Sequence, residues 1–334
     1  MRPIVDPIGV AAPGCPKKMV FGPCGGVRPN GGCEMQSTPC VFTRTAPWPL
    51  PAVAAVNGAP PLVLTDLIVP PADAAELSLM AQLLAPTCDA MLVGDHQDRP
   101  DFSPTLLARL IRDAGAVPWV TLACRDRNRV VLEQELRSLR YEGTATVLCV
   151  TGDGRAFDVR PDVTQVFDLD GTRLAALAAS IGLPVAVAET VSAPPIGVRP
   201  VRLVQKQLAG AGVAVLNHAG SPKQIADFMA AARIEGLTIP VIASVPVYTD
   251  ARSAAVLTAL PGVRIESTAI QAVLDADDPV SAGIRRAVTD ALALLDIDGI
   301  AGVNLSGMAS ARGTAFAAEI QAEIGRAVKA GVAR

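Results

Sequence analysis

The side chains of this sequence that could do chemistry stand mainly where short apolar runs end. They are carboxylates, amides, hydroxyls, histidines and an arginine: Asp66, Asp95, His96, Arg125, Asp126, Thr151, Asp153, Glu189, Asn217, His218, Asn304 and Ser306. Burial disfavours the charged form of a carboxyl, so Asp66 or Asp153 could hold a proton near neutral pH and act as a general acid. Each polar residue also has an ordinary alternative role, because turns after strands recruit Asp, Asn and Gly for local hydrogen bonds.

Two common kinds of site are disfavoured by the sequence. His96 and His218 are the only histidines and fall on different predicted loops, which argues against a histidine-rich metal site. Neither a G-x-x-x-x-G-K-[ST] phosphate loop nor a G-x-G-x-x-G fingerprint occurs. The stretch Thr151-Gly152-Asp153-Gly154 has two interpretations, an ordinary turn or a loop whose glycines let the backbone approach a phosphate or a flat ring.

Residues 1–55 differ from the rest of the chain. They are rich in proline and glycine, show no helical or strand periodicity, and carry Cys15, Cys24, Cys33 and Cys40. Thiolates suit zinc and iron–sulfur clusters, although the spacing lacks the C-x-x-C pairs of zinc ribbons. We interpret residues 1–55 as a cysteine-rich module that binds zinc or an iron–sulfur cluster, or else carries reduced or disulfide-paired cysteines. The proline-rich run at residues 48–51, near the end of this stretch, is interpreted as a linker.

Residues 56–334 alternate between short apolar runs rich in β-branched residues and longer amphipathic segments. This alternation predicts an α/β fold with a parallel sheet, and eight runs match the strand number of a (βα)8 TIM barrel. A doubly wound open sheet is the rival fold. In a barrel the strands would end at one face and bring the polar residues together. The predicted strands are Leu62–Leu67, Ala90–Gly94, Trp119–Cys124, Thr146–Thr151, Pro184–Glu189, Val213–Asn217, Ile239–Val245 and Ile300–Leu305.

Helix signals support the intervening segments. Ser103 followed by Pro104 predicts a capped helix start, and Gly143 and Gly182 are typical of helix ends. Residues 282–295 and 314–328 show helical spacing of apolar residues.

The composition excludes several classes of partner. Among 334 residues the net charge is −3 and only 3% are aromatic, so the chain lacks the basic surface and the stacking rings of nucleic-acid-binding proteins. No apolar run reaches the roughly 18 residues of a membrane span, and the first ten residues do not resemble a signal peptide. Cys88, Cys124 and Cys149 fall in or beside apolar runs as small hydrophobes. We therefore expect a protein of the reducing cytoplasm.

Several segments resemble the methylenetetrahydrofolate reductase family, in the family's order. They are Thr121-Leu-Ala-Cys-Arg-Asp-Arg-Asn-Arg129, Val147-Leu-Cys-Val-Thr-Gly-Asp153, Phe167-Asp-Leu-Asp170, Lys206-Gln-Leu-Ala-Gly-Ala-Gly212 and Ile239-Pro-Val-Ile-Ala-Ser-Val-Pro-Val247. The resemblance spans most of residues 60–310. It implies a barrel that passes a hydride from NADH or NADPH, through FAD or FMN, to 5,10-methylenetetrahydrofolate.

By position, the resemblance also implies roles for individual residues. Asp66 would be the general acid that protonates N10, in place of the usual glutamate, and Asp153 would lie beside flavin and pterin. Lys206 would contact the flavin phosphate. Further implied cofactor-binding residues are Thr121, Thr151, Gly152, Asp170 and Glu189, and implied substrate-binding residues are Asn217, His218 and Asn304.

The chain departs from the family pattern at Asn217-His218, where many members have Thr-Gln, and at Glu189-Thr190-Val191, where they have Tyr-Pro-Glu. Two alternatives therefore remain, a reductase that uses no flavin and an enzyme that uses a deazaflavin. Two further alternatives are a folate-binding barrel that serves C1 or methyl transfer and a non-catalytic partner subunit.

The N-terminal cysteines lie in a second resemblance. The segment from Cys15-Pro-Lys-Lys-Met-Val-Phe-Gly-Pro-Cys24 through Cys40-Val-Phe42 resembles the cysteine-rich module that accompanies methylenetetrahydrofolate reductase-like proteins. It implies a docking site for a partner protein. The sequence leaves open whether the chain forms a homo-oligomer.

Overall fold

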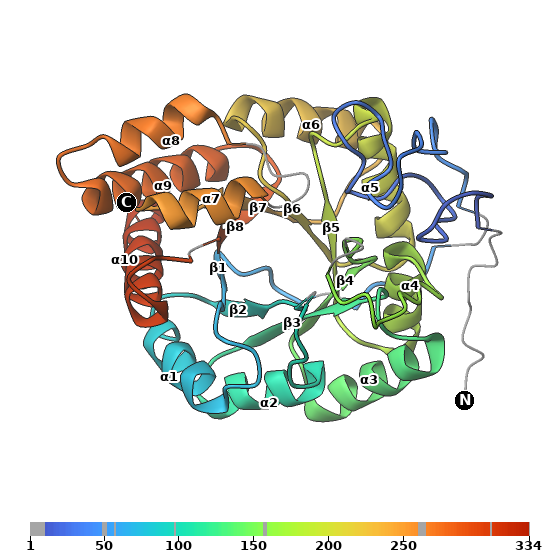
Figure 1. Ribbon diagram of the computed structural model, residues 1–334, viewed down its shortest axis with the longest axis horizontal. Helices are drawn as coiled ribbons and strands as arrows, with labels where there is room; N and C mark the ends of the chain where they lie inside the picture. The colour runs from blue at the N-terminus through green and yellow to red at the C-terminus, as the bar shows by residue number, and fades with distance from the viewer. Residues whose placement is uncertain are drawn as a thin grey trace.

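Eight parallel strands form one closed barrel in the computed structural model of this chain, which describes residues 11–48, 52–56, 58–96, 98–155, 159–259, 265–307 and 309–333 (Figure 1). The strands follow one another in sequence order, and β8 pairs back to β1. The predicted (βα)8 barrel is confirmed, and the open-sheet alternative is excluded. The strands are β1 (Val63–Asp66), β2 (Ala90–Val93), β3 (Pro118–Ala123), β4 (Thr146–Val150), β5 (Val185–Glu189), β6 (Val213–Leu216), β7 (Val241–Pro246) and β8 (Ile300–Ser306).

Helices surround the barrel on the outside, and each predicted strand agrees with the structure to within two residues at either end. Among the residues that the structure describes between β7 and β8 there are three helices rather than one. The helices are α1 (Ala74–Leu84), α2 (Pro104–Asp113), α3 (Arg129–Glu142), α4 (Gly171–Ile181), α5 (Arg199–Leu208), α6 (Pro222–Ile234), α7 (Ala251–Ala259), α8 (Ser267–Leu274), α9 (Pro279–Leu295) and α10 (Thr314–Val332), with a 3-10 turn η1 (Ile196–Val198) before α5.

The helix ends follow the local signals of the sequence. The Ser103 hydroxyl accepts a hydrogen bond from the Leu106 amide at 3.3 Å, and Gly143 and Gly182 end their helices with φ of 68° and 89°. The predicted start of α9 at residue 282 is too late. Asp278 caps that helix and Pro279 occupies its first position, a favourable pair because proline lacks the amide hydrogen that the first turn leaves unbonded.

Apolar side chains form two cores, one inside the barrel and one between the strands and the surrounding helices. A cluster made of strand residues alone fills the inside and includes Leu64, Trp119, Leu148 and Ile242. A larger cluster packs the outward strand side chains against the helices. Because side chains alternate along a strand, Asp66 points inward like Leu64.

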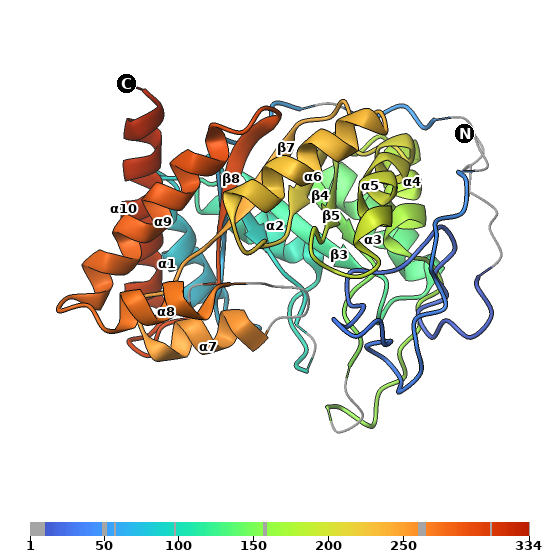
Figure 2. The same ribbon diagram turned by 90° about the horizontal axis from the view of Figure 1, so that it is seen from above.

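The N-terminal segment, residues 11–48, lies against the barrel beside α4 and α5, as the two views show (Figures 1 and 2). It contains no helix or long strand, only an isolated bridge between Gly32 and Pro39. Its apolar side chains Met19, Val20 and Phe21 are buried, so the segment folds by packing on the barrel. The predicted linker falls largely on residues 49–51, which lie outside the described residues, and the predicted module boundary at residue 55 stays a prediction.

Candidate functional site

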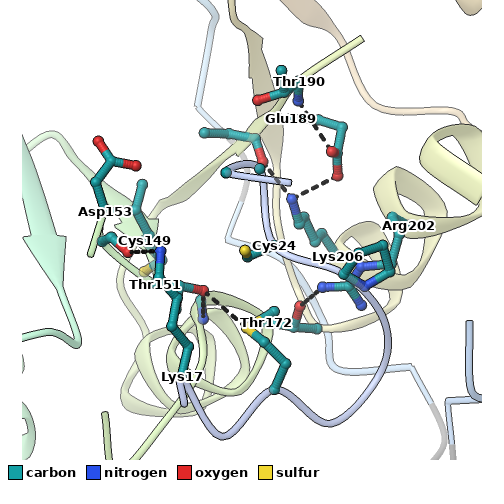
Figure 3. Close-up of a pocket in the computed structure, with 18 of the residues that line it drawn as sticks. Lys17, Cys24, Cys149, Thr151, Asp153, Thr172, Glu189, Thr190, Arg202 and Lys206 are labelled. Atoms are coloured by element: carbon teal, nitrogen blue, oxygen red, sulfur yellow. Dashed lines mark hydrogen bonds and ion pairs between the residues drawn. The ribbon is translucent and has the colours of Figure 1, made fainter. Parts of the chain in front are cut away.

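A cavity of about 280 Å³ lies over the carboxyl ends of β4, β5 and β6 (Figure 3). Barrel and N-terminal residues line it together: Lys17, Met19, Pro23, Cys24, Gly25, Gly26, Cys149, Val150, Thr151, Gly152, Asp153, Gly171, Thr172, Ala188, Glu189, Thr190, Arg202, Lys206 and Asn217. The carboxyl ends of barrel strands are where enzymes of this fold bind their ligands. The cavity brings together seven predicted site residues, the cysteine Cys24 and the barrel residues Thr151, Gly152, Asp153, Glu189, Lys206 and Asn217.

Asp66 lies at the end of β1 and does not line this cavity. The side-chain amide of Asn304, on β8, donates a hydrogen bond to Asp66 Oδ1 at 3.0 Å. Burial raises the pKa of Asp66 to about 7, against the opposing hydrogen bonds from Asn304 and Ser306. Asp66 is therefore protonated in a large fraction of molecules at neutral pH, as a general acid must be.

His218 is buried against β8 rather than open to a ligand. Its Nε2 lies 2.7 Å from the Ser306 hydroxyl, and only 2% of the residue is exposed. Burial lowers the pKa of His218 to about 4, so the imidazole is neutral at physiological pH. Its neighbour Asn217 lines the cavity and accepts a hydrogen bond from the His218 amide at 2.9 Å. The two predicted substrate-binding residues after β6 therefore have different surroundings.

The loop after β4 carries Asp153 at the cavity wall. Burial raises the pKa of the Asp153 carboxyl, and the positive charge of Lys17 opposes that shift. The Thr151 hydroxyl accepts a hydrogen bond from the Gly171 amide at 2.9 Å, which joins this loop to the first residue of α4. Thr121, on β3, is partly exposed but does not line the cavity.

Three of the residues predicted to bind a cofactor are engaged within the protein. Asp170 is fully buried, caps α4 through the amides of Thr172 and Arg173, and accepts a third hydrogen bond from the Val20 amide at 3.1 Å. Glu189 and Lys206 form an ion pair of 2.7 Å. The side-chain oxygens and nitrogen of these three residues are therefore bonded to other protein groups.

The Glu189 carboxylate lies in a buried cluster of charges. It forms a second ion pair with Arg199 at 3.4 Å. Although burial favours the neutral acid, Lys206, Arg199 and Arg202 hold the pKa of Glu189 below its usual range. Glu189 lies two positions after Val187 on β5, and the Val187 side chain packs outward against the helices. Because side chains two positions apart point to the same face of a strand, the Glu189 carboxylate meets α5 and not the barrel interior.

Sequence reasoning missed two cations at the cavity, Lys17 and Arg202. Arg202 is 1% exposed. Its guanidinium donates to Gln205 Oε1 at 2.7 Å and to the Thr172 hydroxyl at 3.1 Å. A signal for Arg202 was present, because it shares one helical face with Arg199 and Lys206 at spacings of three and four. For Lys17 no local signal exists, since its position depends on how the N-terminal segment packs.

The four N-terminal cysteines line a second, smaller cavity together with Glu34 and Met35. Among the residues whose positions are described, no group of three or more His, Cys, Asp or Glu side chains is arranged to hold a metal ion. Cys24 instead donates a hydrogen bond to Glu34 Oε1 at 3.2 Å, and burial raises the pKa of its thiol to about 12. The four cysteines therefore share one cavity without being close enough together to hold a metal ion in this arrangement, and the predicted metal site stays a prediction.

Residues 8–47 match a family model described as "Methylene-tetrahydrofolate reductase C terminal". The chain is similar to methylenetetrahydrofolate reductase-like proteins. The predicted resemblance is thereby confirmed for the cysteine-bearing segment, and the match does not extend into the barrel. A search of curated proteins finds no match.

Two solved structures illustrate the similarity of the fold. A protein of Clostridium thermocellum, described as binding two copies of 5-methyl-5,6,7,8-tetrahydrofolic acid, superposes with a TM-score of 0.59 at 12% identity, covering 84% of this chain and 97% of that chain. Tryptophan synthase from M. tuberculosis, in an open form with BRD0059 bound, has a TM-score of 0.46 at 15% identity, covering 83% of this chain and 94% of that chain. At 12% identity the likeness to the Clostridium thermocellum protein concerns the fold alone. In the part of the chain that the structure describes, no helix is long and apolar enough to cross a membrane.

Proposed function

We propose that this protein binds a reduced folate at the carboxyl face of its barrel and reduces 5,10-methylenetetrahydrofolate to 5-methyltetrahydrofolate. The observation that carries the proposal is the Asp66 carboxyl, which lies at the barrel mouth with a pKa raised to about 7 by burial. The family match of residues 8–47 supports it. So does the barrel of Clostridium thermocellum, which binds a methylated folate.

The chemistry assigned to Asp66 is protonation of N10. Ring opening then leaves a cationic N5 iminium, and a hydride adds to its methylene carbon to give the N5 methyl group. The hydride comes from a reduced nicotinamide, which leaves oxidised. Asn304 and Ser306 keep the Asp66 carboxyl in place through their side-chain hydrogen bonds, and this carboxyl supplies the proton that N10 takes up.

Direct transfer from the nicotinamide, without a flavin, is the variant that we favour. The N-terminal segment contacts the residues that the family resemblance assigns to flavin. Lys17 donates to the Gly152 carbonyl, Val20 donates to Asp170, and the Thr151 hydroxyl lies 3.7 Å from Met19 Sδ. These residues do not fit a flavin while they hold the segment.

The test is an assay of nicotinamide oxidation with 5,10-methylenetetrahydrofolate, using protein purified without added flavin. We expect turnover in the native protein and a roughly 100-fold lower kcat for Asp66→Asn, the size typical of losing a general acid. Asp66→Glu serves as the matched control and should retain most of the activity. Equal rates for Asp66→Asn and native protein would refute the acid role, and stoichiometric bound flavin would refute direct transfer.

A second candidate function is folate binding without reduction, for C1 or methyl transfer or as a partner subunit. The ligand described for the Clostridium thermocellum barrel favours it, since that ligand is already methylated. Tight binding of 5-methyltetrahydrofolate by a native protein that oxidises no nicotinamide would establish this alternative.

A further inference from the structure

The N-terminal segment forms one wall of the candidate ligand cavity. Six of its residues line that cavity: Lys17, Met19, Pro23, Cys24, Gly25 and Gly26. In Figure 3, Lys17 reaches the β4 loop beside Thr151 and Asp153, while Glu189 and Lys206 lie on the opposite side. The barrel strands therefore supply only part of the cavity wall.

We propose that the N-terminal segment is part of the folate site and that Lys17 is a positioning residue, which holds the loop after β4 so that Asp153 can bind the pterin ring. The inference rests on the proposed function. It adds to that function the residues outside the barrel on which substrate binding depends.

Lys17 and Glu34 together hold the residues on either side of Asp153. The Lys17 ammonium donates to the Gly152 carbonyl at 2.6 Å and forms an ion pair with Glu34 Oε1. Glu34 Oε2 accepts a hydrogen bond from the Gly154 amide at 3.2 Å. Asp153 thus lies between two backbone positions that are both bonded to charged side chains of the N-terminal segment.

The packing around these contacts leaves the loop little freedom. Lys17 is 3% exposed. The side chain of Met35 lies directly against Gly154, where a β-carbon would meet its sulfur at 1.8 Å. Gly152 has φ of 90°, a value that favours glycine. The loop conformation is therefore determined by the N-terminal segment as well as by β4.

The buried ion pair between Lys17 and Glu34 is not required merely to pack the N-terminal segment against the barrel. Apolar side chains of similar volume often stabilise a fold as well as a buried ion pair does, because both ions lose their hydration. A charge at this position has a use beside a ligand, since Lys17 favours the ionised form of the nearby Asp153 against burial and Glu34, which both raise the pKa of that carboxyl. The charged groups around Asp153 are Lys17 and Glu34 from the segment and Arg125 from the loop after β3.

The Asp153 carboxylate at the cavity wall indicates which part of the substrate would bind there. An ionised carboxylate accepts hydrogen bonds and donates none. The pterin ring of a reduced folate presents adjacent N–H donors, the ring amide and the 2-amino group, which a carboxylate can accept side by side. Asp153 is therefore suited to the pterin end of the substrate.

The experiment compares the double variant Lys17→Met/Glu34→Gln with native protein and with Lys18→Met. The double change removes both buried charges together, so that neither is left unpaired. Lys18 is the matched control, because its side chain is half exposed and its ammonium donates to the Val166 carbonyl outside the cavity. Calorimetry gives the Kd for 5-methyltetrahydrofolate, and circular dichroism checks the fold.

We expect the double variant to bind roughly tenfold or more weakly, and Lys18→Met to bind like native protein. We also expect a rise in KM to exceed any fall in kcat, since Asp66 is untouched. Unchanged affinity in the folded double variant would overturn the proposal. Should that variant not fold, Lys17→Arg replaces it, because its longer, planar head group would shift the buried contact with Gly152 while keeping the charge. Native affinity in Lys17→Arg would likewise count against the proposal.

Hydrogen exchange separates this inference from the proposed function. If native protein binds no folate, the proposed function fails, but the amides of residues 151–154 still report on the loop. Exchange roughly tenfold faster in the double variant than in Lys18→Met would sustain the positioning role of Lys17. Equal exchange would overturn it.

Discussion

The side-chain amide of Asn304 donates a hydrogen bond of 3.0 Å to the carboxylate of Asp66, a residue 238 positions earlier in the chain. The two meet because the barrel closes: β8 pairs with β1 in parallel, and Asn304 lies in register with Leu64. Closure therefore places an amide donor beside a carboxyl whose pKa burial raises to about 7. The environment of the proposed acid depends on this contact.

The pH dependence of the reaction should report on Asp66. Because the acid form is the active one, we expect kcat/KM to fall as pH rises through about 7, the pKa to which burial raises this carboxyl in the free protein. The hydrogen bond from Asn304 opposes that shift, so Asn304→Leu should move the falling limb to higher pH. Rates measured from pH 5 to 9 test this, and a limb that stays in place in Asn304→Leu would contradict the assignment.

Two buried groups should give opposite dependences of stability on pH. Asp66 has a folded pKa of about 7, above its usual 3.8, so its contribution to stability falls as pH rises between these values. His218 has a folded pKa of about 4, below its usual 6.5, so its contribution falls as pH decreases through that window. In native protein the two effects oppose each other between about pH 4 and 6.5.

Single variants should expose each effect separately. Relative to native protein, Asp66→Asn should gain stability more steeply as pH rises, and His218→Asn should lose stability as pH rises. Urea unfolding at several pH values measures both slopes. Parallel curves for native protein and either variant would show that the group concerned is not buried as described.

Removing the Glu189 carboxylate should destabilise the fold strongly. Glu189→Gln leaves the ammonium of Lys206 and the guanidinium of Arg199 buried without their carboxylate partner. The expected loss is about 3–5 kcal/mol of unfolding free energy. Asp113→Asn is the control, since Asp113 pairs with Arg109 on the exposed surface of α2, where water screens the pair and its loss should change stability little. Similar midpoints in urea for both variants would contradict this account.

Gly302 should not tolerate a side chain. A β-carbon there would lie 2.0 Å from the carbonyl oxygen of Pro61, where β8 passes the chain that leads into β1. We expect Gly302→Ala to lose roughly 1–3 kcal/mol or more of stability, as overpacked cores do. Gly197→Ala is the matched control, because its β-carbon would meet nothing within 4 Å. Thermal unfolding compares the two, and equal stability would show that β8 can move away.

Local patterns in the sequence were sufficient to predict the strands, the capped start of α2 and the ends of α3 and α4. These features depend on side-chain periodicity, on proline at a first turn and on glycine at positive φ, all of which act over a few residues. The same patterns predict that Asp66, Asp153 and Asn217 lie at the carboxyl face of the barrel, because each stands at the carboxyl end of its strand or within three residues after it.

Tertiary structure alone decided how those residues are used. Strands of a parallel barrel are apolar on both faces, so the sequence does not show that Glu189 turns outward to Lys206 and Arg199 while Asp66 turns inward. Nor does it show that Lys17 reaches Gly152, 135 positions along the chain. These contacts come from barrel closure and from the packing of the N-terminal segment, which bring distant parts of the chain together. The local signals of the sequence do not extend over such distances, and so the candidate residues could be predicted while their partners could not.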